Sequence, residues 1–267
     1  MDNRPIGIFD SGVGGLTVTS RVINELPNEE IVYFGDTARV PYGSKSKETI
    51  TKFAKQDIRF LLSRNVKAVV IACNTVSSNS LEELKETFDV PIFGVVKPGA
   101  AEAAKITKNN NVGIIATAAT VRSEAYKKEI LKIKKDVNVY SKACPLFVPL
   151  AEEGWVYDEI THLTAKKYIS ELIEKNIDTI VLGCTHYPLL RECINDTVGP
   201  KVVLVDPAYE TALVLKDYLI KNDMLRDGET APKNEFYVSD KTETFDKICR
   251  QALGKGFDTQ VINIEEY

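Results

Sequence analysis

Two of the five cysteines, Cys73 and Cys184, follow apolar runs that are typical of buried strands. Each precedes polar residues that could bind a ligand, Asn74-Thr75 in one case and Thr185-His186 in the other. A free cysteine is most often a small core residue, but a thiol at a helix N-terminus can have its pKa lowered from about 8.5 toward neutrality. The position of these two thiols therefore favours a chemical role over packing alone.

The other three cysteines have less distinctive surroundings. Cys249 lies on an apolar stripe of helical spacing and Cys193 lies in a helix-like run, so both are expected to be core residues, whereas the role of Cys144 stays open. An odd number of cysteines without a Cys-x-x-Cys pair predicts neither a disulfide framework nor a zinc site. The two histidines are too few for a His-rich metal site, so we expect free thiols and no metal.

An internal repeat gives Cys73 and Cys184 equivalent positions. Asn65-Val66 aligns with Asn176-Ile177 at the same offset of 111 residues that separates the two cysteines. Three further pairs align at slightly smaller offsets: residues 7–11 with 113–117, Val40-Pro41 with Val148-Pro149, and Lys97-Pro98 with Asp206-Pro207. Alternation of strands and helices alone would fit a chance likeness of two halves. The shared register of helix end, strand and following residue favours a real repeat.

Short β-rich runs alternate with amphipathic stretches, which is the pattern of a parallel α/β protein. The expected strands cover residues 6–9, 31–34, 66–72, 92–96, 112–115, 137–140, 177–182, 202–205, 236–238 and 261–264. The sequence thus predicts two similar parallel-sheet α/β domains related by pseudo-twofold symmetry. The first would comprise residues 1–97 and 208–267, and the second residues 98–207. Because ligands bind at the carboxyl ends of parallel strands, we expect the active site in the cleft between the domains.

Two thiols at equivalent positions of a duplicated unit would face each other across that cleft. A cysteine hydrolase pairs one thiol with a histidine, so two opposed thiols favour another reaction. They suit racemisation, in which one thiolate removes the α-proton of an amino acid and the other thiol protonates the opposite face. Because the α-proton is weakly acidic, polar groups around the carboxylate must stabilise the carbanion. Asp10 and His186 are candidate partners of Cys73 and Cys184 respectively, whereas His162 is expected on an exposed helix face.

The turn Gly12-Val13-Gly14-Gly15 matches part of a dinucleotide-binding fingerprint. The full fingerprint needs glycine at position 17, where this chain has threonine, and Asp36 lies inside a longer polar loop. Ser46-Lys47 likewise completes no P-loop. The glycines are therefore interpreted as a turn whose backbone approaches a small anion at a helix N-terminus.

The composition is ordinary for a globular chain of 267 residues, with a formal net charge of −4. This acidic balance gives no reason to expect a nucleic-acid partner. No apolar run reaches the roughly 18 residues that a membrane span needs, and the first residues lack the features of a signal peptide. We therefore expect a cytoplasmic protein that acts on a small molecule and has no membrane partner.

Four segments closely resemble the glutamate racemases of the aspartate/glutamate racemase superfamily. They read FDSGVGGLTV at residues 9–18, GDTARVPYG at residues 35–43, ACNT at residues 72–75 and LGCTHYP at residues 182–188. The segments are ordered and lie in both halves of the chain. The resemblance covers the chain to about Tyr218 and, less distinctively, the tail.

The resemblance implies interconversion of L- and D-glutamate without pyridoxal phosphate, another cofactor or a metal. Cys184 would take the α-proton of L-glutamate and Cys73 that of D-glutamate, with Asp10, Glu152 and His186 assisting. The residues that would bind substrate are Asp10, Ser11, Pro41, Tyr42, Gly43, Asn74, Thr75, Thr117, Thr120, Thr185 and His186. D-glutamate made in the cytoplasm would supply peptidoglycan synthesis, and so cell-wall biogenesis and cell shape. Members of the family commonly dimerise, so a homodimer is a further expectation.

Two alternatives share parts of this pattern. A racemase acting on aspartate or a hydantoin would use the same two-cysteine chemistry and differ only in recognition of the side chain. A non-catalytic binding module for acidic amino acids could keep the fold, although retention of both cysteines argues against it.

Overall fold

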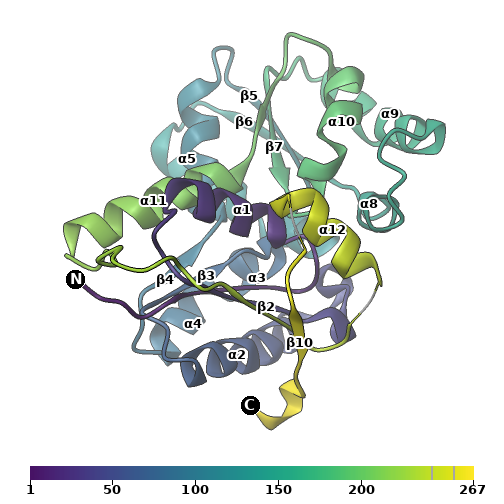
Figure 1. Ribbon diagram of the computed structural model, residues 1–267. Coiled ribbons are helices and arrows are strands. Elements are labelled where there is room, and N and C mark those ends of the chain that lie inside the picture. Colours follow the sequence, from purple (N-terminus) through teal and green to yellow (C-terminus); the bar gives the residue numbers. More distant parts are fainter. Residues whose placement is uncertain (242, 255) are drawn as a thin grey trace.

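The computed structural model describes residues 1–241, 243–254 and 256–267, and its core is formed by two parallel β-sheets (Figure 1). The first sheet has the strand order β10-β9-β2-β1-β3-β4. Its strands are β1 (Ile6–Asp10), β2 (Ile31–Gly35), β3 (Ala68–Ile71), β4 (Ile92–Gly94), β9 (Glu235–Val238) and β10 (Thr259–Val261). The second sheet has the order β6-β5-β7-β8. Its strands are β5 (Asn111–Ala116), β6 (Asn138–Ala143), β7 (Thr179–Gly183) and β8 (Val203–Val205).

Helices cover both faces of each sheet, which explains why the central strands are almost wholly apolar and buried at every residue. The first sheet packs on α1 (Leu16–Glu25), α11 (Pro207–Lys221) and α12 (Glu243–Leu253) with one face, and on α2 (Lys47–Ser63) and α4 (Leu81–Thr87) with the other. The second sheet packs on α5 (Val96–Ile106) and α7 (Ala125–Ile133) with one face, and on α8 (Phe147–Glu152), α9 (Glu159–Ile173) and α10 (Arg191–Val198) with the other.

The predicted internal repeat is present in the strand order. The order β2-β1-β3-β4 in the first sheet has its counterpart in β6-β5-β7-β8, with each strand at the place its aligned partner predicts. Asn65 and Asn176, which the alignment pairs, both have left-handed backbone conformations, with φ of 57° and 53°. Asparagine tolerates this conformation better than most residues. The fold class of two parallel-sheet α/β units is therefore confirmed, and the tail returns to the first sheet as predicted.

All ten predicted strands are present, but their bounds differ from the observed ones by one to three residues, and two of these differences have a local cause. The strand expected at residues 92–96 ends at Gly94, because α5 begins at Val96, whose N–H approaches the Ser77 hydroxyl at 3.4 Å. The strand expected at residues 261–264 lies earlier, at Thr259–Val261. The side chain of Asn263 accepts a hydrogen bond from Glu265 N–H at 3.2 Å, which starts a short 3-10 helix instead.

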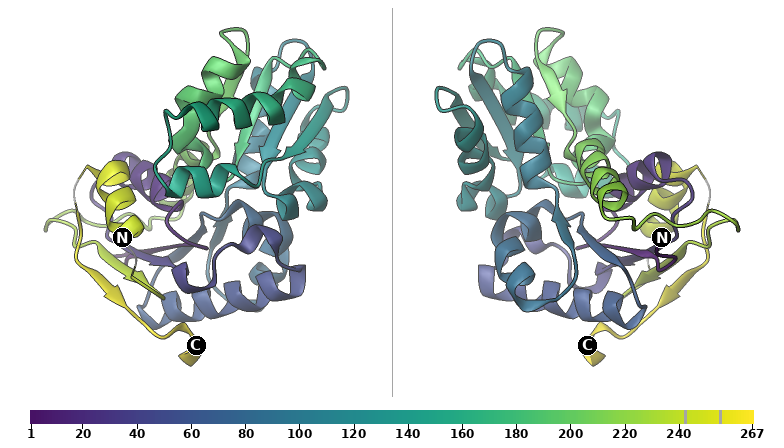
Figure 2. Two further views of the ribbon diagram at one scale, coloured as in Figure 1. Left: turned by 90° about the vertical axis from the view of Figure 1, so that its right-hand side faces the viewer. Right: turned by 90° about the vertical axis from the view of Figure 1, so that its left-hand side faces the viewer.

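The two sheets form two lobes stacked one above the other, and both chain termini belong to the lower lobe in Figures 1 and 2. Helices α5 and α11 pack against each other, and α11 also packs on α1 of the first sheet. The shorter helices α3 (Asn74–Asn79) and α6 (Ala118–Ser123) contact each other where the lobes meet. Within the described ranges, no helix has both the length and the apolar character needed to cross a membrane.

A buried ion pair lies at the amino-terminal ends of strands β2 and β3, on the side of the first sheet opposite the lobe contact. Lys67 Nζ lies 2.6 Å from Glu29 Oε2, both side chains are at most 2% exposed, and Lys67 also donates to the main-chain oxygens of Asp2 and Met224 at 2.7 Å. Lys67→Met would leave the Glu29 carboxylate buried without its cation. We expect the free energy of unfolding, measured by urea denaturation, to fall by about 3–5 kcal/mol.

The matched control for this change is Lys105→Met. Lys105 lies 3.0 Å from Glu102 but is 76% exposed, so its loss should change the unfolding midpoint little. Equal unfolding midpoints for the two variants would contradict the importance assigned to the Lys67–Glu29 pair.

Candidate active site

The two candidate thiols lie at equivalent strand ends of different sheets. Cys73 follows β3 and is the N-cap residue of α3, and Cys184 follows β7. They are buried, with 4% and 6% of their surface exposed. The Ser11 hydroxyl lies 3.5 Å from Cys73 Sγ, and the neighbouring Asp10 accepts a hydrogen bond at 3.4 Å from Thr185, the residue after Cys184. The fold therefore brings the two thiols into one site.

Cys73 is surrounded by groups that keep its thiol protonated. Burial, followed by the nearby Asp10 carboxylate, raises the pKa of Cys73 from 9.0 to about 12. The Ser11 hydroxyl, 3.5 Å from Sγ, and the Val76 N–H oppose this rise only in part. Cys73 therefore does not show the lowered pKa that a helix N-terminus can cause, because α3 is only six residues long and burial outweighs its N–H groups.

Cys184 has a different partner. Its Sγ lies 3.9 Å from Nδ1 of His186, and Nε2 of the same ring lies 3.0 Å from Glu152 Oε1 at the end of α8. Burial by itself would lower the pKa of His186, but its bonds to Cys184 and Glu152 raise that pKa from 6.5 to about 10. At neutral pH His186 is thus an imidazolium held between a thiol and a carboxylate.

Asp10 connects the two sides of the site. Its fully buried carboxylate accepts hydrogen bonds from the N–H groups of Gly12 at 3.2 Å and Gly15 at 2.9 Å, and from the Thr185 hydroxyl of the other lobe at 3.4 Å. Burial raises the pKa of Asp10, and the charge of His186 opposes that rise. Asp10, Thr185 and His186 are therefore electrostatically coupled residues of a single site.

A chain of hydroxyl groups forms another wall between α3 and α6. Thr75 Oγ1 lies 2.9 Å from Thr117 Oγ1, and Thr117 in turn lies 3.1 Å from the Thr120 hydroxyl. Ser78 donates to Thr120 at 3.4 Å from the opposite lobe. The predicted residues Thr75, Thr117 and Thr120 are thus brought together, although Thr75 lies more than forty positions before the other two in the chain.

The loop that carries Pro41, Tyr42 and Gly43 presents its backbone to the candidate site, whereas the aromatic ring of Tyr42 is buried in the first lobe. The Tyr42 hydroxyl points into the core of the first lobe, where it donates to Asp36 and, at 3.3 Å, to Asp57. Gly43 packs directly on Thr117, since an added Cβ would lie 2.8 Å from Thr117 Cβ. The predicted substrate contact of Tyr42 can therefore come only from its main chain.

The remaining cysteines lie in the hydrophobic cores. Cys144 and Cys193 belong to the core under α9 and α10, and Cys249 belongs to the core shared by α1 and α11. His162 is partly exposed on α9. Over residues 1–241, 243–254 and 256–267, His, Cys, Asp and Glu form no group of three or more that could hold a metal ion.

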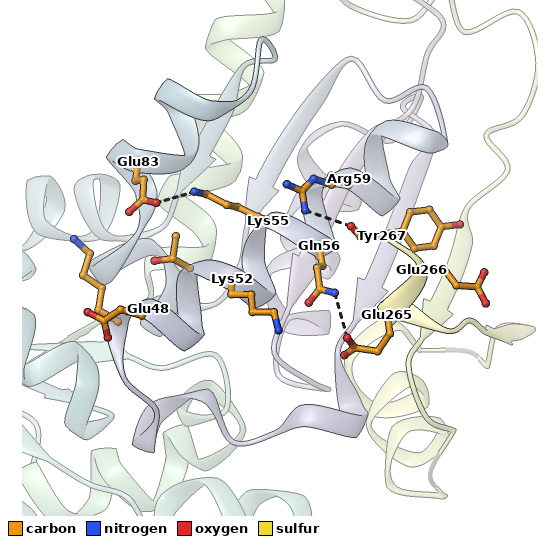
Figure 3. Close-up of a pocket in the computed structure, with 11 residues that line it drawn as sticks. Glu48, Lys52, Lys55, Gln56, Arg59, Glu83, Glu265, Glu266 and Tyr267 are labelled. Atoms are coloured by element: carbon orange, nitrogen blue, oxygen red, sulfur yellow. Dashed lines mark hydrogen bonds and ion pairs between the residues drawn. The ribbon is translucent and has the colours of Figure 1, made fainter.

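A strongly charged groove of about 680 Å³ runs along α2, away from the thiols (Figure 3). Two of its cations are bound within the groove: Lys55 lies 2.8 Å from Glu83, and Arg59 donates to the main-chain oxygen of Tyr267 at 3.3 Å. The described residues that line this groove include none of those predicted for the active site.

Comparison with known proteins decides the family. The profile of the Asp/Glu/Hydantoin racemase family matches residues 6–213. The chain belongs to this racemase family. Among its relatives, the glutamate racemase of Geobacter metallireducens is 49% identical over 251 residues, covering 94% of this chain and 93% of that protein. The glutamate racemase of Thermoanaerobacter pseudethanolicus is 49% identical over the full length of both chains.

Solved structures of the racemase family agree with this membership. The crystal structure of glutamate racemase from Francisella tularensis in complex with D-glutamate has a TM-score of 0.93 and 40% sequence identity, and the match covers 100% of each chain. The likeness therefore extends to both sheets and to the tail that completes the first one.

Sequence inspection missed Tyr126 and Tyr33 as residues of this racemase site. Tyr126 of α7 donates to Asn74 Oδ1 at 2.6 Å, and Tyr33 of β2 donates to the Gly12 carbonyl at 2.6 Å. Both occupy positions where an aromatic residue is typical of a core. The only sequence signal was that each ring carries a hydroxyl, which needs a partner when it is buried.

Gly14 sets how closely the two lobes approach. A Cβ added at position 14 would collide with the Thr185 hydroxyl and lie 2.6 Å from Nδ1 of His186. Gly14→Ala should therefore push these loops apart and lower racemase activity by at least about 100-fold. In Gly12→Ala the added Cβ would lie 3.6 Å from Val40, an ordinary contact, so this matched variant should keep far more activity. Equal losses in steady-state assays would contradict the steric account.

The pKa of His186 provides a second prediction. Because this pKa is raised from 6.5 to about 10, protonated His186 stabilises the fold fully below pH 6.5, and this stabilisation is lost as the pH rises through 10. Glu152→Gln removes the carboxylate that accepts from Nε2 and should lower the pKa of His186. NMR titration of the imidazole measures the pKa of His186 in the wild type and in the variant. An unchanged midpoint in the variant would show that Glu152 does not cause the raised pKa of His186.

Proposed function

We propose that this protein is a glutamate racemase that interconverts L- and D-glutamate by proton transfer between two thiols. The observation that carries the proposal is the position of Cys73 and Cys184, which follow equivalent strands of two sheets that meet where Thr185 donates to Asp10. Membership of the racemase family and near-full-length identity of 49% to proteins named glutamate racemase support the choice of substrate.

In the direction from L- to D-glutamate, Cys184 acts as the base. Its thiolate takes the α-proton, the C–H electron pair stays on the α-carbon as a carbanion, and Cys73 delivers its S–H proton to the opposite face. The raised pKa of Cys73 suits this role, because the thiol holds a proton at neutral pH. In the reverse direction Cys73 becomes the base and Cys184 the acid, so each turnover leaves the enzyme ready for the opposite reaction.

The two thiols have different assistants. The His186 ring lies 3.9 Å from Cys184 Sγ and is paired with Glu152, so it is placed to exchange a proton with Cys184. Asp10 lies on the Cys73 side and is held by backbone N–H groups, so it can receive or return a proton as Cys73 changes state. Similar thiols with unlike assistants therefore carry out the two proton transfers.

Recognition of the substrate is assigned to polar groups around the thiols. We assign the α-carboxylate and ammonium groups and the side-chain carboxylate to Asp10, Ser11, Asn74, Thr75, Thr117, Thr120, Thr185, His186 and the backbone of residues 41–43. Hydrogen-bond donors at the α-carboxylate would stabilise the carbanion, because they interact favourably with the negative charge that develops on the carboxylate oxygens in the transition state. Their origin in both lobes ties substrate binding to the contact between lobes.

The proposal also covers the setting of the reaction. We expect D-glutamate to be made in the cytoplasm for peptidoglycan synthesis, and the enzyme to form a homodimer. We keep the division into a first domain of residues 1–97 and 208–267 and a second of residues 98–207.

The alternative functions are tested by comparing initial rates on L-glutamate and L-aspartate. A faster rate on L-aspartate would reject glutamate as the substrate, and glutamate binding without turnover would favour a binding module.

Cys73→Ser and Cys184→Ser test the mechanism. Serine is nearly the size of cysteine but a much weaker acid, so each variant should lose racemisation of both enantiomers by at least about 10³-fold. Loss of optical activity, followed by circular dichroism from either enantiomer, measures the rate. The matched control is Cys193→Ser, since Cys193 is buried in α10 outside the site and its variant should remain active. Substantial activity in either single site variant would contradict the two-thiol mechanism.

A further inference from the structure

Tyr126 contacts both loops that carry the thiols. Its hydroxyl donates to Oδ1 of Asn74, the residue after Cys73, at 2.6 Å. Its ring packs beside Gly183, the residue before Cys184, where an added Cβ would lie 3.3 Å from Tyr126 Cε2. Tyr126 is 2% exposed and comes from α7 of the second lobe, whereas Asn74 belongs to the first. One side chain thus links the two halves of the reaction centre.

The hydrogen bond to Tyr126 decides how the Asn74 amide is oriented. An amide has an acceptor end and a donor end, and a rotation of 180° exchanges them. A phenol hydroxyl can donate or accept, but in the rotated amide Nδ2 would face it and the buried Tyr126 proton would have no acceptor among the residues that the structure describes. Since Oδ1 faces the Tyr126 hydroxyl, Nδ2 is directed to the other side. Among the residues that the structure describes, none accepts a hydrogen bond from Nδ2, so this donor stays available to a ligand. Burial raises the pKa of Tyr126 well above its usual value, which keeps the hydroxyl protonated as a donor.

We propose that Tyr126 is a positioning residue that holds the Asn74 amide with Nδ2 directed toward the carboxylate of the substrate. The inference rests on the proposed function, in which Asn74 binds glutamate. An amide free to rotate would present Oδ1 to the carboxylate part of the time, and two acceptors repel each other. Tyr126 therefore contributes to affinity and to the preference for an anionic group without touching the substrate.

Core packing accounts for the Tyr126 ring but not for its hydroxyl. The ring belongs to the core formed by α5, α7 and the second sheet, together with Val96, Ala116 and Val181. A phenylalanine at this position would keep those contacts and lose only the bond to Asn74. Tyr126→Phe therefore separates positioning from packing.

The test measures KM and kcat for wild type, Tyr126→Phe, Asn74→Ala and the double variant in both directions. Tyr126→Phe should raise KM about fivefold, as expected for loss of one buried neutral hydrogen bond, with a smaller change in kcat. In the Asn74→Ala background the same change should have no further effect on KM, because the amide it orients is gone. An unchanged KM in Tyr126→Phe, or the same increase in both backgrounds, would overturn the inference.

Two further measurements keep the result interpretable. Tyr237→Phe is the control: Tyr237 is also 2% exposed and bonds Glu235 at 2.7 Å in β9, outside the site, so its variant should keep the wild-type KM. Calorimetric titration with racemic glutamate gives affinity without net turnover, and Tyr126→Phe should weaken it about fivefold. Wild type that binds glutamate but does not racemise it would reject the proposed function alone. Wild-type turnover with unchanged affinity in Tyr126→Phe would reject only the role of Tyr126.

Discussion

The structure depends on the close approach of two loops from different lobes, the turn at residues 10–15 and the segment that begins at Cys184. Gly14 lies so close to Thr185 and His186 that a side chain at position 14 would overlap both. The Thr17 hydroxyl adds a bond across the same contact, donating to the Thr185 carbonyl at 3.2 Å. The proposal that two thiols on separate sheets share one substrate depends on this approach.

The same contact makes the site electrically asymmetric. Cys73 lies near the Asp10 carboxylate, which disfavours its thiolate, whereas Cys184 lies beside the His186 imidazolium. A duplicated fold thus supplies two thiols at matching strand ends, and their surroundings differ because Asp10 at the end of β1 lies near Cys73, whereas His186 follows Cys184. In water such charges would be screened, but at burial near that of a protein core they influence each other strongly. The charge of His186 favours the ionised form of Asp10 and so opposes the rise in pKa that burial causes.

Sequence reasoning predicted the features that follow from local pattern and topology. Residues that follow parallel strands lie at the carboxyl-terminal end of the sheet. The equivalent placement of Cys73 after β3 and Cys184 after β7 could therefore be predicted from the repeat. The bond from Tyr126 to Asn74 could not, because it joins residues 52 positions apart in the chain. The inward direction of the Tyr42 hydroxyl could not either, because it depends on how the loop packs on the first lobe. The direction of the Cys73 pKa shift also depends on depth of burial, which a single sequence does not encode locally.

The central claim is that one thiol serves each face of the substrate, and deuterium labelling at early times tests it most directly. L-glutamate is converted in D₂O, and the two enantiomers are separated after a few per cent of reaction. With two thiols, the D-glutamate formed carries deuterium at the α-carbon because Cys73 delivers a solvent-derived hydron, while the remaining L-glutamate keeps its protium. D-glutamate that retains protium, or equal labelling of both enantiomers, would show a single base and contradict the account.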